Sequence, residues 1–479
     1  MLSFFNTWSR KKELFRPLKP KVATFYSCGP TVYHYPHIGN LRSYFFADIL
    51  KRVLSYDGLK VKHVMNLTDV GHLVSDGDEG EDKIEISARQ RGQTAWEVAE
   101  FFTDVFRRDL EMLNVLNPDI FCKATDHIAE QIKLIKKLEK KGFVYQIEDG
   151  LYFDSIKFRN YGQLARLKIK GLKAGARVKM RTGKKRPTDF ALWKFSYPNG
   201  RDFDSEIDDA SRQRQMEWKS PWGLGFPGWH LECSAMAMKY LGETIDIHTG
   251  GIDHIPVHHT NEIAQSEGAT GKKFVRYWGH NGFLLVEGRK MSKSLGNIVT
   301  LDEIVDRGFE SLTLRYLFLT VHYRSKMNFT WQALTASQQA LRTLRLALSE
   351  WPVGELPIPP AGGLSFLKKF QQAIDDDLNT PKALAVLWQV FKGDLASAEK
   401  KALILEFDKV LGLKLAESET EKIELVEAPS IVQAMVEKRE ALRHSKKWPA
   451  ADQLREKINA AGYLIEDGPS GPQLKKLRK

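Results

Sequence analysis

A strand–helix–strand pattern near the N-terminus limits the folds that this chain can adopt. Residues 22–28 carry β-prone side chains and end in a glycine-containing turn, residues 38–58 have helical apolar spacing, and residues 61–67 form a second apolar strand. This order is typical of the βαβ unit of a parallel sheet, in which ligands bind at the carboxyl ends of the strands. We therefore predict an α/β fold with a Rossmann-type parallel sheet, and we place Cys28 and Thr68 at its ligand-binding edge.

The charge balance indicates the kind of partner. The chain has 72 Lys and Arg against 60 Asp and Glu, which gives a net charge of +12. Such an excess fits a polyanionic partner such as nucleic acid, and it equally fits a surface charge that keeps the protein soluble. The 42% hydrophobic and 11% aromatic content excludes an intrinsically disordered chain. At a length of 479 residues, about three domains are expected.

The few cysteines indicate the compartment. Three cysteines in 479 residues cannot build a disulfide framework, so we expect a reducing compartment, in which a cysteine within a motif is a ligand or a nucleophile. The first 20 residues lack the apolar core of a signal peptide, and no uncharged apolar run reaches the ~18 residues of a membrane helix. We expect a cytoplasmic protein that makes no use of a membrane.

The chain divides into parts of different composition. They are a first half of the sheet domain (1–121), an inserted domain (122–222), the second half of the sheet domain (223–300), the start of a helical region (301–350), a helical bundle (351–425) and a small C-terminal module (426–479). Within the insertion, residues 166–186 contain ten Lys or Arg. This segment is either a loop that meets phosphates or a solvated charged loop.

Two short motifs suit nucleotide chemistry. Residues 37–40, His-Ile-Gly-Asn, stand at the start of the first predicted helix, where backbone N–H groups and the helix dipole favour phosphate. Taken alone, such a histidine is more often a helix cap or a surface residue. Residues 290–294, Lys-Met-Ser-Lys-Ser, place two lysines around a short turn, where their charges can stabilise a triphosphate as pyrophosphate leaves. The alternative for this second motif is an exposed basic turn.

These two motifs resemble the signatures of class I aminoacyl-tRNA synthetases in their cysteinyl form. The first of them is preceded by Cys-Gly-Pro-Thr-Val-Tyr at residues 28–33. Further stretches are similar to that family: residues 228–236, 246–248, 258–267, 375–381 and 451–455. The resemblance spans nearly the whole chain. It implies a Rossmann-type catalytic domain with an inserted connective domain that faces the acceptor end, a helical bundle, and a C-terminal anticodon-binding module.

Four residues form a candidate metal site. Cys28 ends a predicted strand, Cys233 lies in a helix-like run, and His258 and Glu262 are four residues apart, so that they share one face of a helix. Two thiolates, an imidazole and a carboxylate suit Zn²⁺, although cysteines in such proteins are usually small buried hydrophobes. The resemblance implies that these four bind one zinc ion, which accepts the thiolate of the substrate. Cys122 has no matching role, and we expect it in the core.

Zinc would account for selectivity for cysteine. Cysteine and serine have nearly the same shape, so an apolar pocket separates them poorly, whereas zinc–thiolate bonding favours sulfur over a hydroxyl oxygen. No hydrolytic editing domain is then required. The resemblance implies a cysteine–tRNA ligase that forms cysteinyl-adenylate from L-cysteine and ATP with Mg²⁺, and then charges tRNA(Cys). The carboxylate of cysteine is already ionised and attacks the α-phosphate without a general base, so that alignment and charge neutralisation are what the protein supplies.

The resemblance also implies a role for individual residues. The residues expected around cysteine are Gly29, Thr68, Trp229 and Asp253, although Trp229 has core packing as its alternative. Those expected to bind ATP are His37, Gly39, Asn40, Gly250, Gly251, Lys290, Ser292 and Lys293. Of these, His37, Lys290 and Lys293 are the expected catalytic residues. We expect a monomer.

Departures from the family pattern reduce what can be carried over. Asn40 stands where the family usually has His, and because an amide cannot become cationic, we expect Asn40 to bind nucleotide without a major catalytic part. Residues 471–474 lack a nearby aromatic side chain that could stack on anticodon bases. Two alternatives were weighed: a ligase that joins cysteine to an amino sugar, and a non-catalytic tRNA-binding paralogue. The helical and basic C-terminal parts argue against the first, and the joint presence of His37, Lys290 and Lys293 argues against the second.

Overall fold

A computed structural model gives the fold. It describes the chain except residues 74–79, 168–182, 203, 205–213, 293–294, 353–361, 418–419, 424–427, 446, 469–470 and 478–479. The chain forms two compact units, which we describe separately: one takes in residues 1–341 and 354–413, and the other takes in residues 342–353 and 414–479, each apart from these gaps. None of the helices in the described part of the chain has the length and apolar character needed to cross a bilayer.

The first unit is built around a five-stranded parallel sheet. Its strands are β3 (Val22–Ser27), β4 (Lys60–Leu67), β5 (Ile120–Lys123), β11 (Ile245–Gly251) and β12 (Val275–Asn281). They lie in the order β12-β11-β3-β4-β5, and every neighbouring pair is parallel. The chain adds strands on one side of β3 first and then returns to add the others on the opposite side. The predicted parallel sheet is confirmed, and the gap between β3 and β11 is its topological switch point.

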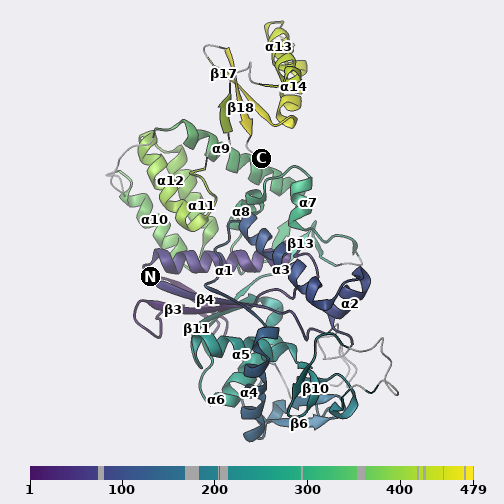
Figure 1. Ribbon diagram of the computed structural model, residues 1–479. Coiled ribbons are helices and arrows are strands. Elements are labelled where there is room, and N and C mark those ends of the chain that lie inside the picture. The colour runs from purple at the N-terminus through teal and green to yellow at the C-terminus, as the bar shows by residue number, and fades with distance from the viewer. Residues whose placement is uncertain are drawn as a thin grey trace. The chain divides into compact units, whose positions relative to one another are not determined.

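Helices cover both faces of this sheet. Helix α1 (Ile38–Tyr56) lies on one face, and α5 (Trp229–Leu241) and α6 (His258–Thr270) lie on the other (Figure 1). The inward-facing residues Leu41 and Ile49 of α1 are almost fully buried, which is typical of the apolar stripe of an amphipathic helix. Each such side chain stabilises the fold by roughly 1.5–3 kcal/mol. The start of α1 is thereby fixed beside the carboxyl end of β3.

The inserted region forms an antiparallel sheet of its own. Its strands are β6 (Val144–Ile147), β7 (Gly150–Phe153), β8 (Phe190–Phe195), β9 (Trp218–Ser220) and β10 (Gly223–Pro227), in the order β6-β7-β8-β10-β9. The predicted insertion boundaries, 122 and 222, differ from the limits of this sheet. Cys122 lies in β5 and pairs with Asn66 of the parallel sheet, and at the other end Pro227 still pairs with Trp193. Most of the basic segment 166–186 falls outside the described residues.

The remaining elements of the first unit are short strands and helices. The strands are β1 (Ser3–Asn6), β2 (Lys11–Leu14), β13 (Leu284–Val286), β14 (Arg289–Lys290) and β15 (Met327–Phe329). The helices are α2 (Lys83–Arg91), α3 (Ala95–Met112), α4 (Ile128–Lys140), α7 (Leu301–Asp306), α8 (Ser311–Leu319), α9 (Trp331–Glu350, which continues into the second unit), α10 (Leu364–Asp375), α11 (Thr380–Lys392) and α12 (Ser397–Leu411). Helices α10 to α12 contact one another in sequence order, and α12 packs against α1.

Three buried charged residues connect α1, α8 and α12. Asp48 of α1 accepts hydrogen bonds from Arg52 of the same helix and from Arg315 of α8. Arg315 also donates to the carbonyl oxygen of Leu411 in α12 at 2.7 Å, and Arg52 donates to that of Lys409 at 3.1 Å. The two guanidinium groups share one carboxylate, and their other N–H groups donate to backbone carbonyls. The hydrogen-bonding groups of these buried charges are thereby paired without water.

The second unit contains a small antiparallel sheet and two helices. The strands β16 (Thr420–Ile423), β17 (Tyr463–Gly468) and β18 (Gly471–Leu477) lie in the order β16-β18-β17. Helices α13 (Ser430–His444) and α14 (Trp448–Ala460) pack against each other. Val432, Val436, Ile458 and Ile465 are among the residues that form its apolar core.

Candidate active site and metal centre

The predicted site residues converge on the carboxyl ends of β3 and β11. Cys28 directly follows β3, and its backbone N–H donates to the carbonyl oxygen of Thr249 in β11 at 3.0 Å. Gly250 and Gly251 end β11. A β-carbon on residue 250 would lie 2.6 Å from Nδ1 of His254, so only glycine fits this close approach. The site therefore occupies the switch point of the sheet, where such folds bind their ligands.

Four candidate metal ligands meet in this place. One atom each of Cys28, Cys233, His258 and Glu262 lies within 4.8 Å of the other three, and all four residues are buried. Cys233 comes from α5, whereas His258 and Glu262 come from successive turns of α6 and lie 3.0 Å apart, from Nε2 to Oε1. The predicted helical spacing therefore holds, and three separate elements contribute donors.

The electrostatics of this cluster favour an anionic sulfur at Cys233, whereas burial and the hydrogen bond with Cys233 raise the pKa of Cys28 well above its usual value. Burial opposes a thiolate, but the hydrogen bond with Cys28 and the charge of His258 hold the pKa of Cys233 at about 6. Burial opposes imidazolium, but Glu262 and Cys233 raise the pKa of His258 to about 10. Burial likewise opposes the carboxylate, and His248 with His258 lowers the pKa of Glu262 to about 2. Without a metal, a thiolate and a carboxylate thus lie around a protonated imidazole, which is a place suited to a cation.

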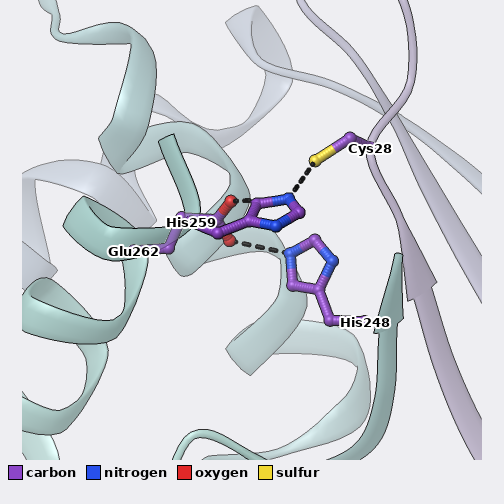
Figure 2. Close-up of side chains that lie close together, drawn as sticks. All are labelled: Cys28, His248, His259 and Glu262. Atoms are coloured by element: carbon purple, nitrogen blue, oxygen red, sulfur yellow. Dashed lines mark hydrogen bonds and ion pairs between the residues drawn. The ribbon is translucent and has the colours of Figure 1, made fainter. Parts of the chain in front are cut away.

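A second donor set overlaps the first. Cys28, His248, His259 and Glu262 also place one ligand atom each within 4.8 Å of one another (Figure 2). His248 Nε2 lies 2.8 Å from Glu262 Oε2, and His259 Nε2 lies 3.2 Å from Cys28 Sγ. The sequence analysis did not name these two histidines as ligands. The spacing of His259, three residues before Glu262 on α6, was a usable signal.

The donor chemistry fits zinc. Two sulfurs, one imidazole and one carboxylate form a donor set that tetrahedral Zn²⁺ accepts. Glu262 Oε1 is buried and lies 3.0 Å from His258 Nε2, so that with a neutral imidazole both atoms offer a lone pair to a metal. His248 and His259 then contact two ligands from outside the set, as the outer partners of metal ligands commonly do.

The four residues predicted around cysteine line this region. Gly29 N–H donates to Asn66 Oδ1 at 2.8 Å, and a β-carbon on residue 29 would lie 1.7 Å from the carbonyl oxygen of Asn66. Thr68 is buried, donates to Glu232 Oε2 at 2.9 Å, and accepts a hydrogen bond from Asn66. Asp253 follows β11 and has a 63% exposed side chain. Thr68 thus contacts the residue next to Cys233, and Asp253 lies nearer to solvent.

Trp229, at the start of α5, lies between two histidine rings. Its ring centroid is 4.5 Å from that of His258 and 4.0 Å from that of His72, which is nearly parallel to the indole. His72 contacts Thr31 Oγ1 at 2.6 Å and accepts from Lys83 Nζ at 2.6 Å. Trp229 therefore contacts a candidate ligand directly and is not confined to the core. His72 was not predicted as a site residue, because no helical or strand spacing relates it to the other predicted residues.

The first phosphate motif caps α1. The backbone N–H of Asn40 donates to His37 Nδ1 at 3.1 Å, and the backbone N–H of His37 donates to Asn40 Oδ1 at 3.2 Å. Burial lowers the pKa of His37, so the neutral imidazole carries its proton on Nε2. The two residues form a reciprocal capping box, which leaves His37 Nε2–H and the Asn40 amide as donors beside the helix N-terminus.

The second motif lies against the first. Lys290 ends β14 and is exposed, and Asn297 bridges the loop by accepting from Ser292 N–H at 3.0 Å and donating to the carbonyl oxygen of Lys290 at 3.1 Å. Ile38 N–H donates to the carbonyl oxygen of Val299 at 2.9 Å. The chain after this loop thus returns to the start of α1. Lys293, the second lysine of the motif, lies outside the described residues.

Comparisons with known proteins agree with this geometry. Residues 14–339 match the model of the class I (C) tRNA synthetase catalytic domain, and residues 369–416 match the DALR domain. A cysteine–tRNA ligase of Burkholderia lata is 49% identical over 474 residues, which cover 99% of this chain and 96% of that protein. The chain belongs to the class I cysteine–tRNA ligase family. It is accordingly an aminoacyl-tRNA synthetase and a ligase, and the resemblance expected from the sequence is confirmed.

Other relatives extend over the same length. The cysteine–tRNA ligase of Treponema denticola is 43% identical, over 99% of this chain and all of that protein. Among solved structures, Mycobacterium tuberculosis methionyl-tRNA synthetase with methionyl-adenylate has a TM-score of 0.54 at 16% identity and covers 82% of this chain and 90% of that one. The ternary LeuRS–tRNA–LeuAMS complex of Agrobacterium radiobacter has a TM-score of 0.57 at 13% identity, over 84% and 85%. These structures support the class I synthetase fold of this cysteine–tRNA ligase family member.

Proposed function

We propose that the protein activates L-cysteine with ATP and transfers it to the 3′ end of tRNA(Cys). The observation that carries this proposal is the position of a two-sulfur donor set at the switch point of the sheet, where Trp229 contacts the candidate ligand His258. The names of relatives that match the whole chain support it. The DALR domain supports an interaction with tRNA. Because tRNA charging serves protein synthesis, we propose a cytoplasmic enzyme, and we propose that it acts as a monomer.

We propose that Cys28, Cys233, His258 and Glu262 hold one Zn²⁺. When bound, zinc would accept the substrate's thiolate as a ligand additional to these four, and it would prefer that thiolate to a hydroxyl oxygen. The side chains of the protein set the rest of the pocket: Gly29 and Thr68 present the carboxyl ends of β3 and β4, and Trp229 covers one side. Selectivity against serine then requires no editing domain.

We propose that the other residues align ATP and neutralise its charge. The carboxylate of cysteine attacks the α-phosphate, the bond to the β-phosphate oxygen breaks, and pyrophosphate leaves with Mg²⁺. His37 Nε2–H, the Asn40 amide and the N-terminus of α1 are donors to phosphate oxygens, while Lys290 and Lys293 stabilise the negative charge that develops on pyrophosphate. Gly250 and Gly251 let the nucleotide approach the backbone. No general base is needed, because the attacking carboxylate is ionised.

Cysteine-dependent exchange of pyrophosphate into ATP tests the first half of this proposal, and charging of tRNA(Cys) tests the second. With zinc present, we expect exchange with cysteine and none with serine. If cysteine does not stimulate exchange, the proposed activity is wrong. Exchange without charging of tRNA would instead favour the amino-sugar ligase. Removal of zinc by a chelator should abolish exchange, and added Zn²⁺ should restore it.

A further inference from the structure

Arg42, in the second turn of α1, has no part in the chemistry described above, yet its environment is unusual. The residue is 2% exposed, and its guanidinium donates to five backbone carbonyl oxygens. They belong to Gly282 at 2.8 Å, Phe283 at 3.1 Å, His322 at 3.2 Å, Tyr323 at 3.4 Å and Ser325 at 2.8 Å. All five contacts come from the two terminal nitrogens, Nη1 with two acceptors and Nη2 with three, so one N–H is shared between carbonyls in a planar fork that no other side chain can reproduce.

The charge of Arg42 is balanced by carbonyl dipoles alone. No carboxylate of the described residues forms an ion pair with it, and burial lowers its pKa to about 10. Arg315 provides a contrast, because this equally buried arginine pairs with Asp48. A buried cation without a counter-ion is unfavourable unless each donor is satisfied. The carbonyl groups around Arg42 are therefore confined to the positions in which they accept these bonds.

Two of those carbonyls open the segment that carries the lysine motif. Gly282 and Phe283 directly precede β13, and Leu285 of β13 pairs with Lys290 of β14. The far end of the same segment also meets α1, through the hydrogen bond from Ile38 to Val299. Both ends of the lysine segment are thus joined to the first two turns of the helix that begins after His37.

We propose that Arg42 is a positioning residue that sets the register of the Lys290 segment against the His37–Asn40 helix start. It acts through the carbonyls of residues 282–283 and 322–325 and touches no reacting atom. The inference rests on the proposed adenylate-forming activity, which gives Lys290 its task. Loss of Arg42 leaves the Ile38 contact in place but removes the hydrogen bonds that join the start of the segment to α1, so that Lys290 loses its fixed distance from the phosphates.

Kinetics separate this role from a general contribution to folding. A displacement of about 1 Å at a catalytic group can reduce a rate by about a hundredfold. We expect Arg42→Met to lower kcat for cysteine-dependent pyrophosphate exchange at least tenfold. The KM for cysteine should stay within about twofold, because the cysteine pocket is built from β3, α5 and α6. Arg42→Lys keeps the charge but has no planar fork, and it should lose kcat in the same way.

Arg315→Met is the matched control, since it removes an equally buried guanidinium that does not contact the lysine segment. It should lower the unfolding temperature while kcat at 25 °C stays within about threefold of the wild type. All variants are measured as full-length, zinc-loaded protein for unfolding temperature, zinc content, kcat and both KM values. If kcat falls in Arg42→Met and Arg315→Met in proportion to lost stability, Arg42 is only structural and the proposal is wrong.

Gly282→Ala tests the same idea without removing the charge. A β-carbon there would lie 2.7 Å from the carbonyl oxygens of both Arg324 and Ser325, and so it would separate the carbonyl groups that Arg42 joins. For Gly282→Ala we expect a loss of kcat with an unchanged KM for cysteine. This variant provides the test if Arg42→Met does not fold. Wild-type kcat in folded Gly282→Ala or Arg42→Lys would overturn the proposal. A wild-type protein without cysteine-dependent exchange would instead overturn the proposed function itself.

Discussion

Gly39 and Met291 touch across the two phosphate motifs: a β-carbon on residue 39 would lie 2.6 Å from Cε of Met291. Real β-carbons essentially never approach within 3.0 Å, so a side chain at residue 39 would require the flexible end of Met291 to move away from the helix start. The glycine therefore has two functions. In the proposed reaction it would let phosphate approach the helix start, and it leaves space for the methionine that stands between Lys290 and Ser292.

The first prediction concerns this contact. Gly39→Ala should lower kcat for pyrophosphate exchange, because the added methyl group displaces the end of the Met291 side chain beside the start of α1, where we propose that phosphate binds. Adding Met291→Ala to the same chain should recover much of the loss, because it removes the clashing atom. Gly268→Ala on α6 is the control, since its β-carbon would meet only ordinary contacts at 3.4 Å or more, and it should leave kcat unchanged. A double variant no better than Gly39→Ala would contradict the steric explanation.

The second prediction separates the two overlapping donor sets. Cys233→Ser and His258→Ala should each lose bound zinc and cysteine activation together, because each removes a ligand. His259→Ala should keep zinc, as should Cys122→Ser, whose sulfur donates to the carbonyl oxygen of Met65 and belongs to neither donor set. Metal content by atomic emission and exchange activity provide the readout. Zinc retained by Cys233→Ser and lost by His259→Ala would move the metal to the other set.

The third prediction concerns the proposed contact between metal and substrate. Replacement of zinc by Co²⁺ makes the site visible through its thiolate-to-cobalt absorption. Adding L-cysteine should increase this absorption, because a further sulfur enters the coordination sphere, whereas L-serine should not change it. An equal response to both amino acids, or to neither, would mean that the substrate thiolate does not bind the metal.

The fourth prediction separates helix capping from nucleotide binding at Asn40. Asn40→Asp keeps the oxygen that accepts from the backbone N–H of His37, and so the unfolding temperature should hardly change. It removes the amide donor and adds a negative charge beside the phosphates, so kcat should fall tenfold or more. Asn40→Ala loses the cap, at a stability loss of about 0.5–1 kcal/mol, with a smaller loss of kcat. Equal kcat in both variants would argue against a phosphate contact at Asn40.

The fifth prediction concerns pH. His63 of β4 is fully buried, contacts Ser27 Oγ at 2.8 Å, and stacks on Phe25. Burial, aided by the charge of Lys51, holds the pKa of His63 well below 6.5. Below pH 6.5, His63 is protonated in the unfolded chain but stays neutral in the folded chain. The free energy of unfolding therefore decreases as the pH falls below 6.5. Between pH 6.5 and 5.5, His63→Gln should lose about 1 kcal/mol less unfolding free energy than the wild type, as denaturant titrations can measure.

Much of the framework could be predicted from the sequence, because it depends on periodic patterns. The apolar runs of residues 22–67 predict β3, α1 and β4, since strand and helix spacing differ. The four-residue spacing of His258 and Glu262 predicts that both face one point, and the structure brings Cys28 and Cys233 to it. The role of these four as zinc ligands stays a prediction.

Other features left no periodic signal. The place of Cys122 in β5 gave no sequence signal, because a strand of four residues is too short to show a period. The five acceptors of Arg42 are backbone carbonyls, which every residue type possesses, so no sequence pattern could indicate them. His72 is a second example. It lies far from Trp229 in the sequence, and no spacing rule connects the two residues whose rings stack in the structure.

The shared carboxylate of Asp48 bears on how the family can be recombined. Because its two arginine partners reach the carbonyls of Lys409 and Leu411, the last helix of the bundle completes the electrostatics of a buried cluster on α1. A bundle grafted from a relative must bring the carbonyl oxygens at the end of α12 to the same positions, because these two guanidinium groups would otherwise lose acceptors away from water. The sheet and the bundle should therefore melt in one calorimetric transition, and they would be inherited as a pair and not as interchangeable modules.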